Sequence, residues 1–122
     1  MKPNILIVDD EKEARNNMRS FLSLRFNANY VEASDGDEAI KYLKKNKCDL
    51  MILDIKMPKK SGLTVIDQAI ELDPKLKILM ISGWVDDDVA QEALKRGATD
   101  YIPKPLSMQA LEIKVRNILN KI

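Results

Sequence analysis

Residues 49–58 read Asp-Leu-Met-Ile-Leu-Asp-Ile-Lys-Met-Pro, and this stretch organises the rest of the chain. Leu50 to Leu53 are four consecutive apolar residues, which predict a short strand buried on both faces of a sheet. The strand delivers Asp54 to its carboxyl end, and Pro58 ends the run with a turn. A carboxylate in this position is either a helix cap or a functional group, and the flanking sequence has to distinguish the two.

The composition predicts one soluble globular domain that spans residues 1–122. Of its residues, 45% are hydrophobic and 32% are charged, and 20 basic against 19 acidic residues give a net charge of +1. Since no overall field directs such a protein toward anions, neither a nucleic acid nor a membrane is expected as a partner. The N-terminus leads directly into a strand and lacks the features of a secretory signal, which favours a cytoplasmic location.

The residue types restrict the chemistry that is available. The chain has no histidine, which removes most zinc sites and Ser-His or Cys-His catalysis. Its single cysteine, Cys48, has no partner for an internal disulfide and is expected to be a small core residue. Carboxylates, hydroxyls and lysines remain as functional groups.

Five short strand-like runs alternate with five amphipathic patterns along the chain. The expected strands are residues 5–8, 29–33, 50–53, 76–81 and 99–102, and the first expected helix runs from residue 11 to about residue 26. This alternation predicts an α/β fold with a parallel sheet and right-handed crossovers. The second and fifth strands are short and polar, as edge strands are, so we expect a doubly wound, flavodoxin-like sheet of order 2-1-3-4-5.

Local signals mark several helix ends. Asp35 and Glu38 have the spacing of a capping box, and Ser107 is a suitable cap for the last helix. Four lysines between residues 41 and 47 are compatible with a docking patch, but cations at a helix carboxyl end are the favoured interpretation. The helix that follows Asp86-Asp87-Asp88 has an apolar face of small residues and is expected to be the most mobile one.

Three carboxylates are expected to meet at the carboxyl edge of the sheet. Asp9, Asp10 and Asp54 follow strands one and three, between which doubly wound sheets bind their ligands. These charges repel one another, and a hard cation would relieve the repulsion. Oxygen ligands without histidine or thiolate favour Mg²⁺, which takes one or two carboxylates together with phosphate oxygens.

The neighbouring strand ends carry groups that suit a phosphoryl ligand. Ser82 ends strand four and offers a hydroxyl, and Lys104 follows strand five and offers an ammonium group. A carboxylate can attack phosphorus to form an aspartyl phosphate, and Asp54 is central in this set. Each residue alone is better explained as a cap or a solvated side chain, but their joint placement favours a site.

Four segments together resemble the receiver domain of two-component response regulators, over Ile5 to about Leu119. They are residues 7–11 (IVDDE), 53–58 (LDIKMP) with Gly62 downstream, 81–83 (ISG) and 97–105 (GATDYIPKP). The resemblance implies that Asp54 accepts phosphate from a sensor histidine kinase or a histidine phosphotransfer protein. It also implies that Asp10, Asp54 and the backbone carbonyl of Lys56 hold Mg²⁺, with Asp9 acting directly or through water.

The resemblance also implies how the phosphoryl group is sensed. Ser82 and Lys104 would contact its oxygens, and Tyr101 would rotate inward as Ser82 moves, which reshapes the surface of helix four, strand five and helix five. Lys56 and Trp84 flank the site and are expected to tune a slow self-dephosphorylation. Apart from these reactions on itself, the domain is expected to be a signalling module and no enzyme.

The surface of helix four, strand five and helix five is also a possible homodimer interface. On it we expect Arg116 to pair with Asp100, and Ile113 to lie off the buried stripe of the last helix. The family also implies a cis bond between Lys104 and Pro105. The output domain or target protein is not encoded in any recognised motif.

Three other functions compete with this hypothesis. A flavodoxin-like electron carrier would have to bind a phosphate beside Asp9-Asp10-Glu11, which would repel it. A phosphatase of the haloacid dehalogenase type would need a second acid at position 56, where the chain has a lysine. A phosphate-independent receiver that only binds proteins is disfavoured by the complete set of acids, serine and lysine.

Overall fold

Strands and helices alternate along the whole of the described chain. The structure is a computed structural model that describes residues 2–55, 60–83 and 87–122. The strands are β1 (Asn4–Val8), β2 (Asn29–Ala33), β3 (Leu50–Ile55), β4 (Lys77–Ser82) and β5 (Asp100–Pro103). The helices are α1 (Lys12–Ser23), α2 (Gly36–Lys45), α3 (Lys60–Leu72), α4 (Asp87–Lys95) and α5 (Met108–Leu119).

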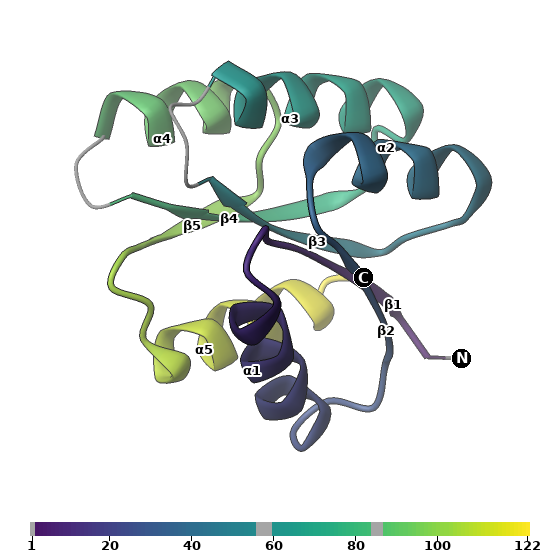
Figure 1. The fold of residues 1–122 in the computed structure, drawn as a ribbon, viewed down its shortest axis with the longest axis vertical. Helices are drawn as coiled ribbons and strands as arrows, with labels where there is room; N and C mark the ends of the chain where they lie inside the picture. The colour runs from purple at the N-terminus through teal and green to yellow at the C-terminus, as the bar shows by residue number, and fades with distance from the viewer. Residues whose placement is uncertain (1, 56–59, 84–86) are drawn as a thin grey trace.

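The strands form one parallel sheet in the order β2-β1-β3-β4-β5. Helices α2, α3 and α4 cover one face of the sheet, and α1 and α5 cover the other (Figure 1). The predicted doubly wound α/β fold and its strand order are therefore confirmed. The polar runs of β2 and β5 lie at the edges because an edge strand exposes one side to water.

The core consists of two apolar clusters, one on each face of the sheet. Successive residues of β3 point to opposite faces, so Met51, Leu53 and Ile55 belong to the cluster under α2, α3 and α4. Leu50 and Ile52 belong to the cluster under α1 and α5. This double burial explains why the central strand is a continuous apolar run. No helix in the described part of the chain is long and apolar enough to cross a membrane.

The predicted caps and the buried cysteine are confirmed. Asp35 accepts a hydrogen bond from the Glu38 amide at 2.8 Å, and Ser107 accepts one from the Ala110 amide at 3.2 Å. Cys48 is 4% exposed and packs in the cluster under α2 and α3. Burial of this thiol raises its pKa to about 12.

Two local expectations are wrong. Helix α1 ends at Ser23 rather than near residue 26, and the chain leaves it through a turn in which the amides of Arg25 and Phe26 share the Leu22 carbonyl. The predicted pair of Arg116 and Asp100 is also absent. On α5, one turn separates Arg116 from Glu112, and their side chains pair at 2.6 Å.

The carboxylate of Asp100 pairs with Lys114 instead, at 2.8 Å. A lysine two residues earlier on α5 therefore makes the contact with β5 that sequence reasoning gave to Arg116. The prediction for Ile113 is confirmed, because its side chain is 51% exposed and lies off the buried stripe of α5. The Lys104-Pro105 bond is cis, as the resemblance implied.

Candidate functional site

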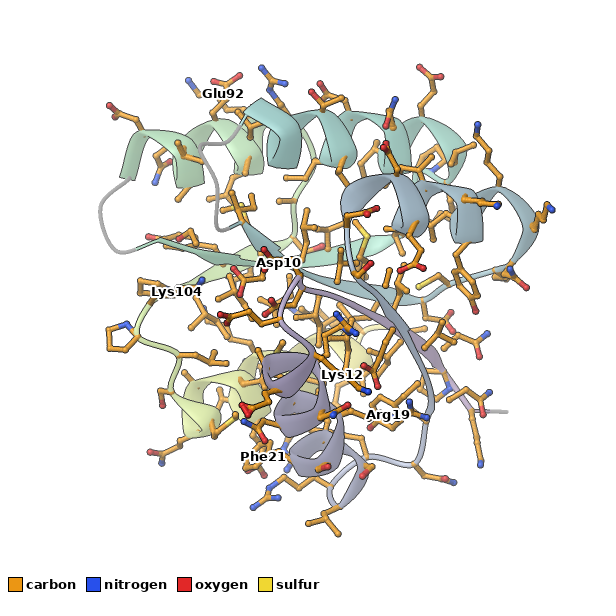
Figure 2. All side chains as sticks on the ribbon, in the orientation of Figure 1. Asp10, Lys12, Arg19, Phe21, Glu92 and Lys104 are labelled. Carbon is orange, nitrogen blue, oxygen red and sulfur yellow. The ribbon has the colours of Figure 1, made fainter. Side chains whose placement is uncertain are left out.

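The predicted site residues lie at the carboxyl ends of four neighbouring strands. Asp9 directly follows β1, Asp54 is the penultimate residue of β3, Ser82 ends β4 and Lys104 directly follows β5. Parallel pairing aligns these ends, since Val8 is opposite Leu53, and Ile55 is opposite Ser82. Figure 2 shows Asp10 and Lys104 at the level of the sheet, between the two helix layers.

Asp54 and Lys104 form a close charged contact at this edge. The Lys104 Nζ atom lies 2.8 Å from Asp54 Oδ1, a distance at which the opposite charges attract although the direction is not that of a hydrogen bond. The Asp54 side chain is only 6% exposed, and that of Lys104 is 25% exposed. The backbone amide of Lys104 donates to the Ser82 carbonyl at 2.9 Å, which holds Lys104 beside the end of β4.

Asp54 also lies close to the buried carboxylate of Asp9. Burial, followed by the hydrogen bond and charge of Asp9, raises the pKa of Asp54 to about 6, and Lys104 only partly opposes this effect. Asp9 is 2% exposed, and its Oδ1 accepts a hydrogen bond from the Glu11 amide at 2.9 Å. The edge thus holds two buried acids in contact, an arrangement that favours either a shared proton or a cation.

A hollow of about 220 Å³ opens above these acids. Its walls include Asp9, Asp10 and Asp54, and the turn of Ser34 and Asp35 that leads into α2. The acids therefore face an accessible space, smaller than a typical small-molecule pocket but large enough for a hydrated ion or a phosphoryl group.

The donors at this edge suit Mg²⁺ by their chemistry. They are carboxylate oxygens, and the repulsion between the buried Asp9 and Asp54 is the kind that a divalent cation relieves. Among the described residues, no three acidic or thiol side chains are grouped as a complete metal site. Since Mg²⁺ keeps several waters and needs only one or two carboxylates, these residues fit the ion that the sequence predicted.

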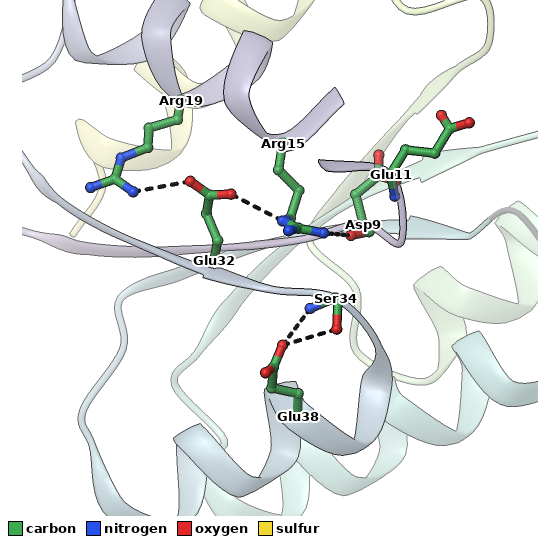
Figure 3. A network of polar contacts seen from close by, with 7 residues as sticks. All are labelled: Asp9, Glu11, Arg15, Arg19, Glu32, Ser34 and Glu38. Carbon is green, nitrogen blue, oxygen red and sulfur yellow. Dashed lines mark hydrogen bonds and ion pairs between the residues drawn. The ribbon is translucent and has the colours of Figure 1, made fainter. Parts of the chain in front are cut away.

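A polar network anchors the loop that carries Asp9 (Figure 3). Arg15 donates to the Asp9 carbonyl at 2.7 Å and to Glu32 of β2 at 3.0 Å, and Arg19 contacts the other oxygen of Glu32 at 3.0 Å. Burial raises the pKa of Glu32, but hydrogen bonds and charges from Arg19 and Arg15 outweigh it and lower the net value. Glu32 therefore stays ionised and holds Arg15 against the loop.

Sequence reasoning missed Arg15 and Glu32. Their opposite charges are visible in the chain, but nothing in the local pattern shows that the first turns of α1 lie over β2. That placement depends on β1 and β2 pairing in parallel, which puts Glu32 beside Ile7. Only the assembled sheet brings the two side chains together.

The predicted switch residues occupy neighbouring strands. Ser82 is 3% exposed, and its hydroxyl makes no hydrogen bond with the residues that the structure describes. Tyr101 of β5 is half-buried and packs against the cluster under α2, α3 and α4, and its register partner is Met80. The predictions for Lys56 and Trp84 lie outside the described residues.

The sequence model of one protein family, the response regulator receiver domain, matches residues 5–116. The chain belongs to this family. Protein CcdB of Bacillus subtilis is 35% identical over 97% of the chain and 95% of its own length. Response regulator MprA of a Mycobacterium species is 36% identical over 99% of the chain, but the chain spans only 52% of MprA, about half its length.

Solved structures of receiver domains have the same fold. A CheY-like receiver domain protein from Methanospirillum hungatei aligns with a TM-score of 0.90 and 26% identity, over 99% of the chain and 96% of its own. A receiver domain protein from Clostridium thermocellum aligns with a TM-score of 0.87 and 30% identity, over 98% and 95%. The chain is therefore a signalling domain of the two-component type. Membership of the family implies a histidine kinase as partner and general dependence on Mg²⁺.

Proposed function

We propose that Asp54 is the phosphoacceptor of a receiver domain formed by residues 1–122. The observation that carries this proposal is the position of its buried carboxylate, beside Asp9 and 2.8 Å from the ammonium of Lys104. An acid in this setting is held at the strand end by its neighbours and faces an open hollow. The donor would be a phosphohistidine of a sensor kinase or of a histidine phosphotransfer protein.

In the transfer, a carboxylate oxygen of Asp54 forms a bond to phosphorus as the bond from phosphorus to the donor imidazole breaks. The imidazole nitrogen keeps that electron pair and leaves as the neutral ring after taking up a proton. Lys104 and the Ser82 hydroxyl would contact the phosphoryl oxygens and offset their charge. Asp9, Asp10, Asp54 and the Lys56 carbonyl would hold Mg²⁺, which supplies further positive charge to those oxygens when bound.

The signal would leave the site through Ser82 and Tyr101. The hydroxyl of Ser82 is directed to the phosphoryl oxygen, and Tyr101 fills the space that this movement vacates. The surface of α4, β5 and α5 is reshaped in response and serves as the contact for an output domain, a target protein or a second copy. Lys56 and Trp84 would tune a slow hydrolysis of the aspartyl phosphate that returns the domain to its resting state.

The test is phosphorylation with a small-molecule phosphodonor in the presence of Mg²⁺, followed by intact mass and by the fluorescence of Trp84. The wild type should gain one phosphoryl group and change its fluorescence, as it should with beryllofluoride. The Asp54→Asn variant should do neither. Asp67→Asn, which changes an exposed acid on α3, is the matched control and should behave like the wild type. A metal-dependent phosphoprotein that persists in Asp54→Asn would overturn the assignment.

A further inference from the structure

A second hollow of about 490 Å³ lies at the opposite edge of the sheet. It is bounded by the amino ends of β3 and β4 and by the chain that follows α2, α3 and α5. Asp49, which lines it, directly precedes β3, and Asp54 near the end of that strand is about 16 Å away at the usual rise of a strand. The hollow is therefore separate from the phosphoacceptor site.

Four lysines from three separate segments line this hollow, which we call the lysine hollow. They are Lys47, Lys75, Lys77 and Lys121. None of their ammonium groups forms an ion pair with the residues that the structure describes. All the arginines of the chain, by contrast, are paired with carboxylates. The lysine hollow thus gathers four ammonium groups that form no ion pair within the described part of the chain.

The carboxylates of the hollow are occupied by backbone amides. Asp49 Oδ2 accepts from the Asn4 amide at 2.8 Å, and Asp73 Oδ1 accepts from the Lys75 amide at 3.0 Å. Both acids therefore have a structural role at the ends of their segments. Two carboxylates against four ammonium groups leave the side chains of the lysine hollow with an excess of positive charge.

Helix dipoles do not account for these lysines. Cations are favoured in the last turn of a helix, and the effect falls off beyond that turn. The basic residues in the last turn of α2 are Lys44 and Lys45, the last turn of α5 has Arg116, and that of α3 has none. The four lysines of the hollow all lie beyond the helix ends, and Lys77 is the first residue of β4.

We propose that the lysine hollow binds a small molecule with several phosphate groups. An ammonium group is a compact point charge that suits phosphate, and several of them around one hollow raise the local concentration of anions. The volume of about 490 Å³ is in the range of small-ligand sites. A nucleoside polyphosphate and an inorganic polyphosphate share the required chemistry.

The test is a titration with inorganic tripolyphosphate and, in parallel, with ATP, in Mg²⁺-free buffer at constant ionic strength. Calorimetry should show one saturable site, and thermal unfolding should shift upward with ligand because only the folded state binds it. The same titrations on the Asp54→Asn variant should give the same affinity and the same thermal shift as on the wild type. This outcome does not depend on whether Asp54 is the phosphoacceptor. If the two ligands bind with equal affinity, the hollow recognises the phosphate chain alone. If ATP binds more tightly, the hollow also contacts the nucleoside.

Matched variants locate the site. Lys77→Gln with Lys121→Gln should weaken binding at least about tenfold, because hydrogen bonds between charged groups are among the stronger ones. Lys41→Gln with Lys95→Gln removes two exposed lysines elsewhere and should change nothing. Asp73→Asn keeps an oxygen for the Lys75 amide but removes a negative charge, so it should tighten binding. Equal weakening of binding by both pairs of substitutions would overturn the proposal. A thermal shift no larger than that produced by sodium chloride at the same ionic strength would also overturn it.

Discussion

The ammonium nitrogen of Lys104 lies 2.8 Å from Oδ1 of Asp54, at the carboxyl edge of a five-stranded parallel sheet. Lys104 reaches this position because its amide is bonded to the Ser82 carbonyl at the end of the neighbouring strand. The contact offsets part of the charge that Asp9 and Asp54 bring into a buried place. Resting charge balance and phosphoryl binding therefore depend on the same lysine.

Replacing Lys104 with glutamine should slow phosphorylation of Asp54 by about 10²- to 10³-fold, the usual loss when one donor to a developing negative charge is removed. The rate is measured with a small phosphodonor at fixed Mg²⁺. Lys114→Gln removes another ion-paired lysine, the partner of Asp100, and should keep the wild-type rate. An unchanged rate in Lys104→Gln would exclude a role for this ammonium in the transfer.

Removing the charge of Asp54 should stabilise the metal-free fold. Burial and the nearby Asp9 raise the Asp54 pKa from 3.8 to about 6, so the folded state binds a proton more readily than the unfolded chain. The free energy of unfolding therefore falls as the pH rises from about 4 through 6. In Mg²⁺-free urea denaturation at about pH 7.5, Asp54→Asn should exceed the wild type by on the order of 1–3 kcal/mol. The gain should disappear near pH 4, and a gain that is independent of pH would contradict this origin.

Arg15 should act on the metal site through the backbone of Asp9. Arg15→Ala removes the donor to the Asp9 carbonyl, so the loop loses its anchor and Mg²⁺ affinity should fall about tenfold, as for other groups that orient ligands. Calorimetric titration with Mg²⁺ measures the change. Arg19→Ala is the control, because Arg19 pairs with the other oxygen of Glu32 and does not donate to the Asp9 carbonyl. Equal losses in both variants would indicate a general effect on stability.

Cys48 should be protected from alkylation in the folded state. Burial raises its pKa from 9.0 to about 12, and its thiol donates to the Leu50 carbonyl at 3.2 Å. Because each pKa unit lowers the thiolate fraction tenfold, native protein at about pH 8 should react with iodoacetamide about 10³-fold more slowly than urea-unfolded protein. Mass spectrometry follows the labelling. Rapid labelling of the native protein would show that this part of the core opens to solvent.

Much of the fold followed from local patterns. The run from Leu50 to Leu53 indicated a strand covered on both faces, and the polar run from Asn29 to Ala33 indicated an edge. The pair of Arg116 and Asp100 was predicted wrongly, because the choice between two cations on α5 depends on how the helix is rotated over β5. That rotation follows from packing and has no local signal.

The sequence by itself determined the alternation of strands and helices, the order of the strands and the acids at their carboxyl ends. These features follow from the pattern of apolar and polar residues within short segments of the chain. The tertiary structure alone decided which groups meet. Parallel register brought Lys104 against Asp54, set Arg15 between Glu32 and the Asp9 loop, and gathered the lysines at the far edge. Such contacts join segments far apart in the chain, so their geometry exists only once the sheet and both helix layers have packed.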